Sequence, residues 1–190
     1  EFLPKLRALE GEFGKEIMSE AIEISKLTES NILKRTNVIG KLRNLACDLK
    51  VINSNPRWKT FKFDPDKGRV THGSIFEAKA AITAEKNGIT GVLQRADRGF
   101  DFVEEVDGMR KYWDVKSAIC YSFNELHTLQ VTEFIDSINK QLLVNGVEIL
   151  LDLGSACSKD VKLIKEAVDL LPVSMRQRIA IVESYELFRS

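Results

Sequence analysis

The sequence predicts a mixed α/β (α+β) fold, in which a β-sheet of mixed strand direction is flanked by helices and preceded by a helical N-terminal portion. Three observations predict it. Apolar residues recur at helical spacing over two long stretches before residue 53. Asp107-Gly108 separates two strand-like runs, as in a tight β-hairpin. After residue 110, strand-like and helix-like segments alternate, which is typical of parallel strands joined by crossover helices.

The composition is that of a globular protein with an even balance of charge. Of its 190 residues, 44% are hydrophobic and 29% are charged, which suits a domain with a substantial core. Its 28 basic residues equal its 28 acidic residues, so any nucleic-acid site must be a local patch. No membrane-spanning run and no zinc or disulfide framework is expected. The chain begins with Glu1 rather than Met, which leads us to expect a piece of a longer protein.

Two helices are expected before a break in the chain at residues 53–56. The first covers residues 4–27 and the second residues 30–51. The break consists of two asparagines, a serine and a proline, which do not continue a helix. We therefore expect a helical portion over residues 1–53 and a second domain over residues 54–190.

The segment after the break combines basic and aromatic residues. A turn-forming run of Asp, Pro, Lys and Gly predicts a hairpin within residues 57–69. Its basic side chains would follow a phosphate backbone and its tryptophan would stack on a base. The candidates for these contacts are Arg57, Trp58, Lys59 and Lys62. Alternatively, Trp58 belongs to the core together with Phe61 and Phe63, and the lysines are merely solvated.

From residue 73 the chain predicts the order helix, three strands, helix, strand, helix, strand. The first helix covers residues 73–88, where a glycine would cap its C-terminal end. The expected strands lie at residues 89–95, 99–106, 110–118, 147–153 and 178–182. The other expected helices lie at residues 130–144 and 159–171.

An acid and a lysine lie two positions apart in the third of these strands. Side chains alternate between faces along a strand, so Asp114 and Lys116 point to the same face. Trp113 and Val115 then point to the other face. The alternative for the acid and the lysine is the solvated face of an ordinary strand.

Two further acids precede this pair. Asp101 lies between Phe100 and Phe102, which we expect to face the core and to leave the acid on the opposite face. Glu77 lies on the preceding helix, where Glu85 is the alternative two turns further on. Three acids and one amine that converge on one sheet edge would bind a divalent metal ion and activate a water molecule, which suits phosphodiester hydrolysis.

This element order, with the acids where they fall, resembles the core of the PD-(D/E)XK nuclease superfamily. That family shares an αβββαβ unit, the restriction-endonuclease-like core, with an acid on the first helix, another on the second strand and an acid-x-Lys pair on the third. Over residues 73–153, the matching residues are Glu77, Asp101, Asp114 and Lys116. The proline of the family motif is absent and Phe100 stands in its place, a departure that the superfamily tolerates.

The resemblance implies a metal-dependent endonuclease with Mg²⁺, or else Mn²⁺ or Zn²⁺, as its cofactor. Asp101 and Asp114 would hold the ion, and Glu77 would hold a metal-bound water or a second ion. Lys116 would orient or deprotonate the attacking water and offset charge in the transition state.

Two more polar residues are candidate substrate contacts. Ser117 follows the catalytic lysine and would touch a phosphate, although a small residue at a strand end needs no function. Lys140 and its polar neighbours on the following helix would reach the substrate. A solvent-facing stripe is the alternative for that helix.

A helical portion joined to such a nuclease is also similar to the C-terminal toxin regions of bacterial contact-dependent growth inhibition proteins and related polymorphic toxins. This resemblance implies secretion or cell-surface delivery within a larger protein, action on tRNA or DNA in the target-cell cytoplasm, and a cognate immunity protein. Neutral net charge favours a structured substrate such as tRNA over indiscriminate cutting of duplex DNA. A restriction- or repair-type DNA endonuclease and a non-catalytic protein interaction module remain as alternatives.

Overall fold

A computed structural model divides the chain into two compact units. It describes residues 2–28, 38–97, 99–118, 127–144, 146–154, 156 and 158–183. The first unit ends at Ile75 and the second begins at Phe76. The sequence analysis places its break earlier, after residue 53, so the assignment of residues 54–190 to one domain stays a prediction.

The first unit begins with helices α1 (Phe2–Phe13), α2 (Lys15–Thr28) and α3 (Val38–Ile52). The single helix expected over residues 4–27 is interrupted at Gly14, whose φ of +87° is readily adopted by glycine. The apolar stripes predicted from the sequence form the interior of this helical part. Its buried residues include Leu9, Met18, Ala21, Ile24, Leu42, Ala46, Leu49 and Ile52. Residues 30–37 of the second predicted helix lie outside the described residues.

A short helix and a two-stranded hairpin follow. Helix α4 (Trp58–Phe61) precedes β1 (Phe63–Asp64), which pairs in antiparallel fashion with β2 (Arg69–Val70). The hairpin expected within residues 57–69 is therefore present, but it begins only at Phe63. The preceding residues form a helical turn instead.

The carboxylate of Glu20 ties α4 to α2. The indole nitrogen of Trp58 donates a hydrogen bond to Glu20 Oε1 at 3.0 Å, and the ammonium group of Lys62 contacts the same oxygen. Asn53 Nδ2 donates to Glu20 Oε2 at 3.1 Å. Trp58 and Phe61 are both almost fully buried. Of the two alternatives for these aromatics, the structure places Trp58 and Phe61 in the core, whereas the expectation that Phe63 joins them was wrong, because Phe63 is exposed on β1.

Replacing Glu20 is expected to destabilise the first unit. Burial raises the pKa of Glu20, but hydrogen bonds from Lys62, Trp58 and Asn53 outweigh burial, so the pKa lies below its ordinary value. A lowered folded-state pKa means stabilisation that is present above the unfolded-state pKa and lost as the pH falls through the folded-state value. We expect Glu20→Gln to lower the free energy of unfolding by about 1 kcal/mol at pH 7, since a partly exposed carboxylate is screened. Urea unfolding measures this, with the exposed Glu16→Gln as the control on the same helix; equal losses in both variants would contradict it.

The second unit is built on a mixed sheet. Its elements in chain order are α5 (His72–Lys86, from Phe76 onward), β3 (Leu93–Arg95), β4 (Phe102–Val106), β5 (Met109–Ser117), α6 (His127–Leu142), β6 (Val147–Asp152), α7 (Ser158–Asp169), α8 (Val173–Arg176) and β7 (Ile179–Val182). Within the described residues the sheet has five strands in the order β3-β4-β5-β6-β7. β3, β4 and β5 are antiparallel, whereas β5, β6 and β7 are parallel. The predicted mixed α+β class and the order αβββαβ are confirmed; the short helix α8 was not predicted.

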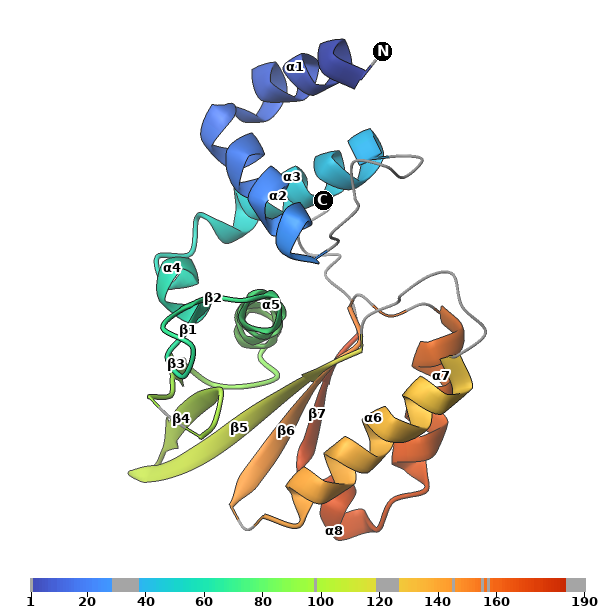
Figure 1. Ribbon diagram of the computed structural model, residues 1–190. Coiled ribbons are helices and arrows are strands. Elements are labelled where there is room, and N and C mark those ends of the chain that lie inside the picture. The colour runs from blue at the N-terminus through green and yellow to red at the C-terminus, as the bar shows by residue number, and fades with distance from the viewer. Residues whose placement is uncertain are drawn as a thin grey trace. The chain divides into compact units, whose positions relative to one another are not determined.

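Helices α6 and α7 cover one face of the parallel half of the sheet (Figure 1). Alternation along β6 directs Ile149 and Leu151 to these helices, where they meet Ile138 of α6 and Ile164 of α7. The guanidinium group of Arg178 closes the turn between α6 and β6, since it donates to the carbonyl oxygens of Leu142, Val144 and Val147 at 2.6 to 3.0 Å. This packing fixes β6 and, through it, the position of β5.

None of the helices in the described part of the chain has the length and hydropathy of a bilayer span.

Candidate active site

The β4–β5 hairpin sets two acids opposite each other. Asp107 and Gly108 both have positive φ values, 52° and 77°, and form the tight turn that the sequence predicts. Continuing the antiparallel register of β4 and β5 by one residue places Asp101 opposite Asp114. A local turn signal therefore determines which acids face each other across the strands.

Asp101 is fixed at the point where β4 begins. Its amide donates to the carbonyl oxygen of Trp113 at 3.1 Å. Its carboxylate Oδ2 accepts a hydrogen bond from the amide of Val115 at 2.7 Å. The carboxylate of Asp101 thus accepts a hydrogen bond from a β5 amide that lies beyond the first residue of β4, Phe102.

The flanks of Asp101 differ from the sequence-based expectation. Phe102 is fully buried, as predicted, but Phe100 is only half-buried and packs on Tyr112 with ring centroids 4.8 Å apart. The chain bends at Gly99, where φ is +78°. Strict strand alternation therefore does not extend to Phe100, and the prediction that both aromatics face the core was wrong for this one.

Asp114 and Lys116 share a face of β5, as the sequence predicts. Lys116 Nζ lies 2.5 Å from Asp114 Oδ2, and both side chains are partly exposed. The intervening Val115 and the preceding Trp113 are buried on the other face. Ser117 also lies on that other face, where its hydroxyl donates to Asp152 Oδ2 at 2.8 Å. Its predicted contact with a phosphate stays a prediction.

Arg95, at the end of β3, is a member of the cluster that the sequence analysis missed. Its Nη2 lies 2.6 Å from Glu77 Oε2, and its guanidinium stacks over the ring of Phe102 at 5.0 Å. The side chain is 7% exposed, and within the described residues its Nε and Nη1 atoms have no hydrogen-bond partner. Glu85, the alternative helix acid, instead accepts the amide of Leu93 at 2.6 Å.

The three acids form one electrostatic cluster around Asp101. The pKa of Asp101 is raised from 3.8 to about 7, chiefly by burial and then by the negative charges of Glu77 and Asp114. The hydrogen bond from the Val115 amide and the charge of Arg95 act in the opposite direction. The structure thus brings together the helix acid, the strand acid and the acid-x-Lys pair that the sequence singles out.

The cluster has the chemistry of a hard-cation site. With all groups ionised, the three carboxylates outnumber the two cations Arg95 and Lys116 that are paired with them. Repulsion from Glu77 and Asp114 therefore adds to the effect of burial on the pKa of Asp101. Among the described residues, no group of three or more His, Cys, Asp or Glu side chains is arranged to hold a metal ion. Glu77 pairs with Arg95. Asp101 and Asp114 supply the two carboxylates that, with phosphate oxygens and waters, suffice for Mg²⁺. The metal stays a prediction.

The other predicted substrate contacts lie outside this cluster. Lys140 is exposed near the end of α6, and Lys59 is exposed on α4. Arg57 lies over the ring of Phe61 at 5.1 Å. Lys62 is paired with Glu20. Contact of these basic residues with nucleic acid stays a prediction, whereas Trp58 is buried and hydrogen-bonded in this conformation.

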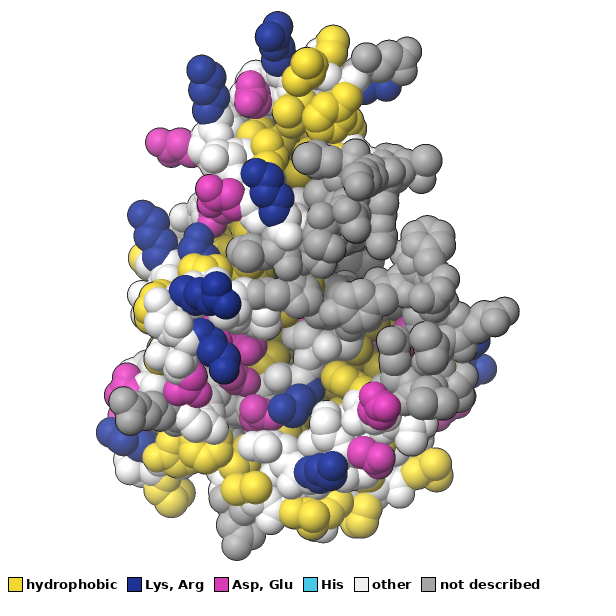
Figure 2. Space-filling view, viewed as in Figure 1, with side chains coloured by type: hydrophobic (Ala, Val, Ile, Leu, Met, Phe, Trp, Pro, Cys, Tyr) yellow, Lys and Arg dark blue, Asp and Glu magenta, His cyan; other side chains and the backbone are white. Residues whose placement is uncertain are grey.

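Charges of both signs are interspersed on the surface. Figure 2 shows Lys and Arg side chains among Asp and Glu side chains over the described part of the face in view. This agrees with the equal numbers of basic and acidic residues in the sequence. Recognition of a polyanion would therefore depend on individual basic side chains rather than on one large positively charged surface.

Comparison with known proteins gives one structural similarity to report. No protein-family model matches the sequence, and no curated protein sequence matches it. The chain is similar in structure to a CdiA-CT toxin from Burkholderia pseudomallei, solved in complex with its cognate CdiI immunity protein. The identity is 20% and the TM-score 0.45, over 56% of this chain and 97% of that chain. A similarity at this level does not decide function.

Proposed function

We propose that the second unit is a metal-dependent endonuclease that hydrolyses phosphodiester bonds in nucleic acid. The observation that carries this proposal is the cluster around Asp101, a partly buried carboxylate that lies opposite Asp114, is held by the Val115 amide, and has its pKa raised to about 7. A fold gains no stability from acids gathered against their mutual repulsion, so such clusters are typical of functional sites. The Asp114/Lys116 pair on the adjoining strand supplies an amine that can orient a water molecule and offset negative charge.

Each residue of the cluster has a separate task in this proposal. Asp101 and Asp114 hold the divalent ion, which when bound polarises the phosphate and makes a water molecule more acidic. The Val115 amide keeps the carboxylate of Asp101 in place. Lys116 positions the attacking water and offsets the negative charge that builds up on the phosphate in the transition state.

Arg95 fits a role in holding the phosphate. Its guanidinium is buried, is fixed by Glu77 and Phe102, and retains two nitrogen atoms without a hydrogen-bond partner among the described residues. Buried donors that lack a partner are costly. A phosphate oxygen would supply acceptors in the geometry that a guanidinium favours. We therefore assign the phosphate contact to Arg95.

The conservative replacement Arg95→Lys is expected to reduce cleavage about tenfold or more. Lysine keeps the positive charge beside Glu77 but lacks the planar set of donors, so a charge-assisted hydrogen bond to the phosphate is lost. Steady-state cleavage rates measure this, with Arg176→Lys on an exposed residue of α8 as the control. Unchanged rates for Arg95→Lys would show that the arginine serves only as the counter-ion of Glu77.

We further propose that this nuclease is a toxin domain, delivered from the cell surface within a larger protein and neutralised by a cognate immunity protein. The support is the resemblance described for the sequence, a helical portion joined to a core with acids on the first helix and on two strands. Neutral charge and mixed surface patches favour tRNA over duplex DNA as the substrate. A restriction- or repair-type enzyme would prefer DNA.

The direct test is incubation of the purified full chain with total tRNA and with plasmid DNA. Each mixture contains a chelator, Mg²⁺, Mn²⁺ or Zn²⁺, and the Asp114→Ala variant is run beside the parent. Metal-dependent loss of one substrate, absent in the variant, is the expected result. If no substrate is cut and calorimetry detects no metal binding, the chain is an interaction module instead.

A further inference from the structure

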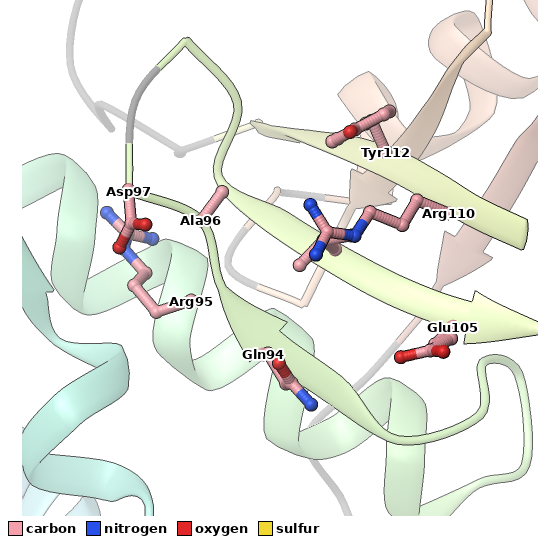
Figure 3. Close-up of a pocket in the computed structure, with 8 residues that line it drawn as sticks. Gln94, Arg95, Ala96, Asp97, Glu105, Arg110 and Tyr112 are labelled. Carbon is pink, nitrogen blue, oxygen red and sulfur yellow. The ribbon is translucent and has the colours of Figure 1, made fainter. Parts of the chain in front are cut away.

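A groove opens on one face of the antiparallel half of the sheet. It encloses about 450 Å³ and is lined by residues of β3, β4 and β5, among them Gln94, Val103, Glu105, Arg110 and Tyr112. In Figure 3, the side chains of Gln94, Glu105, Arg110 and Tyr112 rise from these three strands on the same side of the sheet. The volume lies within the range of small-ligand sites.

The strand register explains why these side chains line one groove. Gln94 is paired with Val103, Val103 with Tyr112, and Glu105 with Arg110. Directly paired residues in a sheet point to the same face, so the five side chains stand together.

Two residues that line the groove, Arg110 and Tyr112, lie on the same face of β5 as Asp114 and Lys116. Along β5 the side chains of Arg110, Tyr112, Asp114 and Lys116 point to one face, in steps of about 7 Å. A bound chain that passes over the Asp114/Lys116 pair along this strand therefore meets Tyr112 next and Arg110 after it.

The lining suits a nucleobase better than a phosphate. Tyr112 is half-buried and backed by the ring of Phe100, so it forms a fixed aromatic platform. Arg110 donates hydrogen bonds, Glu105 accepts them and Gln94 does both, which matches the mixed donors and acceptors on the edge of a base. Apart from Arg95, which is paired with Glu77 and is assigned to the cut phosphate, the charged residues of the lining are Arg110, Asp97 and Glu105, so the groove has no excess positive charge to attract a second phosphate.

We propose that this groove binds the base of an unpaired nucleotide next to the phosphate that is cut, so that the substrate is looped or single-stranded nucleic acid rather than continuous duplex. The proposal rests on the proposed nuclease function, because Asp114 and Lys116 define where the cut phosphate would lie relative to the groove. A base within a duplex is stacked on both sides and cannot offer a ring face to Tyr112. Ribose and deoxyribose nucleotides share this chemistry, and the experiment distinguishes them.

The test measures binding without cleavage in the full-length Asp114→Asn variant. The probes are a short fluorescent single-stranded RNA, the DNA of the same sequence, and the duplex of each, followed by anisotropy with Mg²⁺ present. We expect the single strands to bind more tightly than the duplexes. Addition of Tyr112→Leu, which removes the platform, should weaken single-strand binding by about tenfold or more.

A matched pair of variants separates the groove from general charge. Arg110→Gln and Lys111→Gln each remove one positive charge from adjacent positions of β5, but only Arg110 lines the groove. Arg110→Gln should weaken binding severalfold and Lys111→Gln should not, a comparison that also holds if Tyr112→Leu fails to fold. Equal binding of duplex and single strand, or equal effects of the two charge variants, would overturn the proposal.

Failure of the nuclease proposal gives a different pattern. If the parent chain cuts nothing while single-strand binding still depends on Tyr112, the base-binding role of the groove is supported and the catalytic assignment is contradicted. If cleavage occurs but Tyr112→Leu affects neither binding nor the cleavage rate, the base-binding role of the groove is contradicted and the nuclease function is supported. The relative affinities of the RNA and DNA probes then show whether the groove prefers ribose or deoxyribose nucleotides.

Discussion

Asp114→Ala is expected to abolish phosphodiester cleavage without the loss of unfolding free energy that a core cavity would cause. The carboxylate is one of two that hold the ion in the proposed mechanism, and such a ligand is worth several kcal/mol in the transition state, so the rate should fall by at least about a thousandfold. The side chain lies on the partly exposed face of β5, so its removal opens no cavity in the core. Cleavage time courses with Mg²⁺ and a urea titration measure the two effects.

The control for this variant is Asp169→Ala, which removes an exposed carboxylate from the end of α7. It should retain full activity. A second consequence concerns Asp101, because the negative charge of Asp114 is one cause of its raised pKa. The pKa of Asp101 should therefore fall in Asp114→Ala. Equal cleavage by this variant and the parent would remove Asp114 from the active site.

The fold could be predicted largely from local patterns. Helical periodicity located α6 and α7, an alanine-rich run that ends at a glycine located α5, and the Asp107-Gly108 turn fixed the β4–β5 hairpin. The break of the first helix at Gly14 was missed because a single glycine is tolerated within many helices. The helical turn at α4 was missed because its geometry depends on Glu20, which lies 38 residues from Trp58 in the sequence.

The site could be predicted only where its residues share one strand or one turn. The two-residue spacing of Asp114 and Lys116 was enough to place them on one face. Arg95 was not predicted, because its position beside the acids depends on the pairing of β3 with β4 and on the approach of α5. The groove depends on the same pairing. Strand alternation from Asp114 would nevertheless have singled out Tyr112 and Arg110.

The stability of the metal-free protein is expected to contain a contribution that falls as the pH rises from about 4 to about 7. The pKa of Asp101 is raised to about 7 in the folded chain from its ordinary value of 3.8. Between these values the folded chain binds a proton that the unfolded chain has released, so stability decreases with pH in this window. Above pH 7 the carboxylate is ionised in both states, and the full loss is on the order of a few kcal/mol.

Asp101→Asn is expected to remove this contribution. The amide oxygen of asparagine still accepts the hydrogen bond from Val115, but the side chain stays neutral at every pH. In the presence of a chelator the variant should therefore be more stable than the parent at pH 8 and similar to it at pH 4. Urea unfolding at both pH values measures the difference, and Asp136→Asn on the exposed side of α6 is the control. The same pH dependence in Asp101→Asn and the parent would contradict the assignment.

Addition of Mg²⁺ to the same titrations separates repulsion within the cluster from metal binding. A divalent ion at Asp101 and Asp114 favours the ionised carboxylate, so it should raise the unfolding midpoint of the parent more at pH 8 than at pH 5. Asp101→Asn has no carboxylate to ionise at this position and should gain little at either pH. If Mg²⁺ stabilises the parent and the variant equally, the ion binds elsewhere, and the raised pKa of Asp101 reflects burial and repulsion alone.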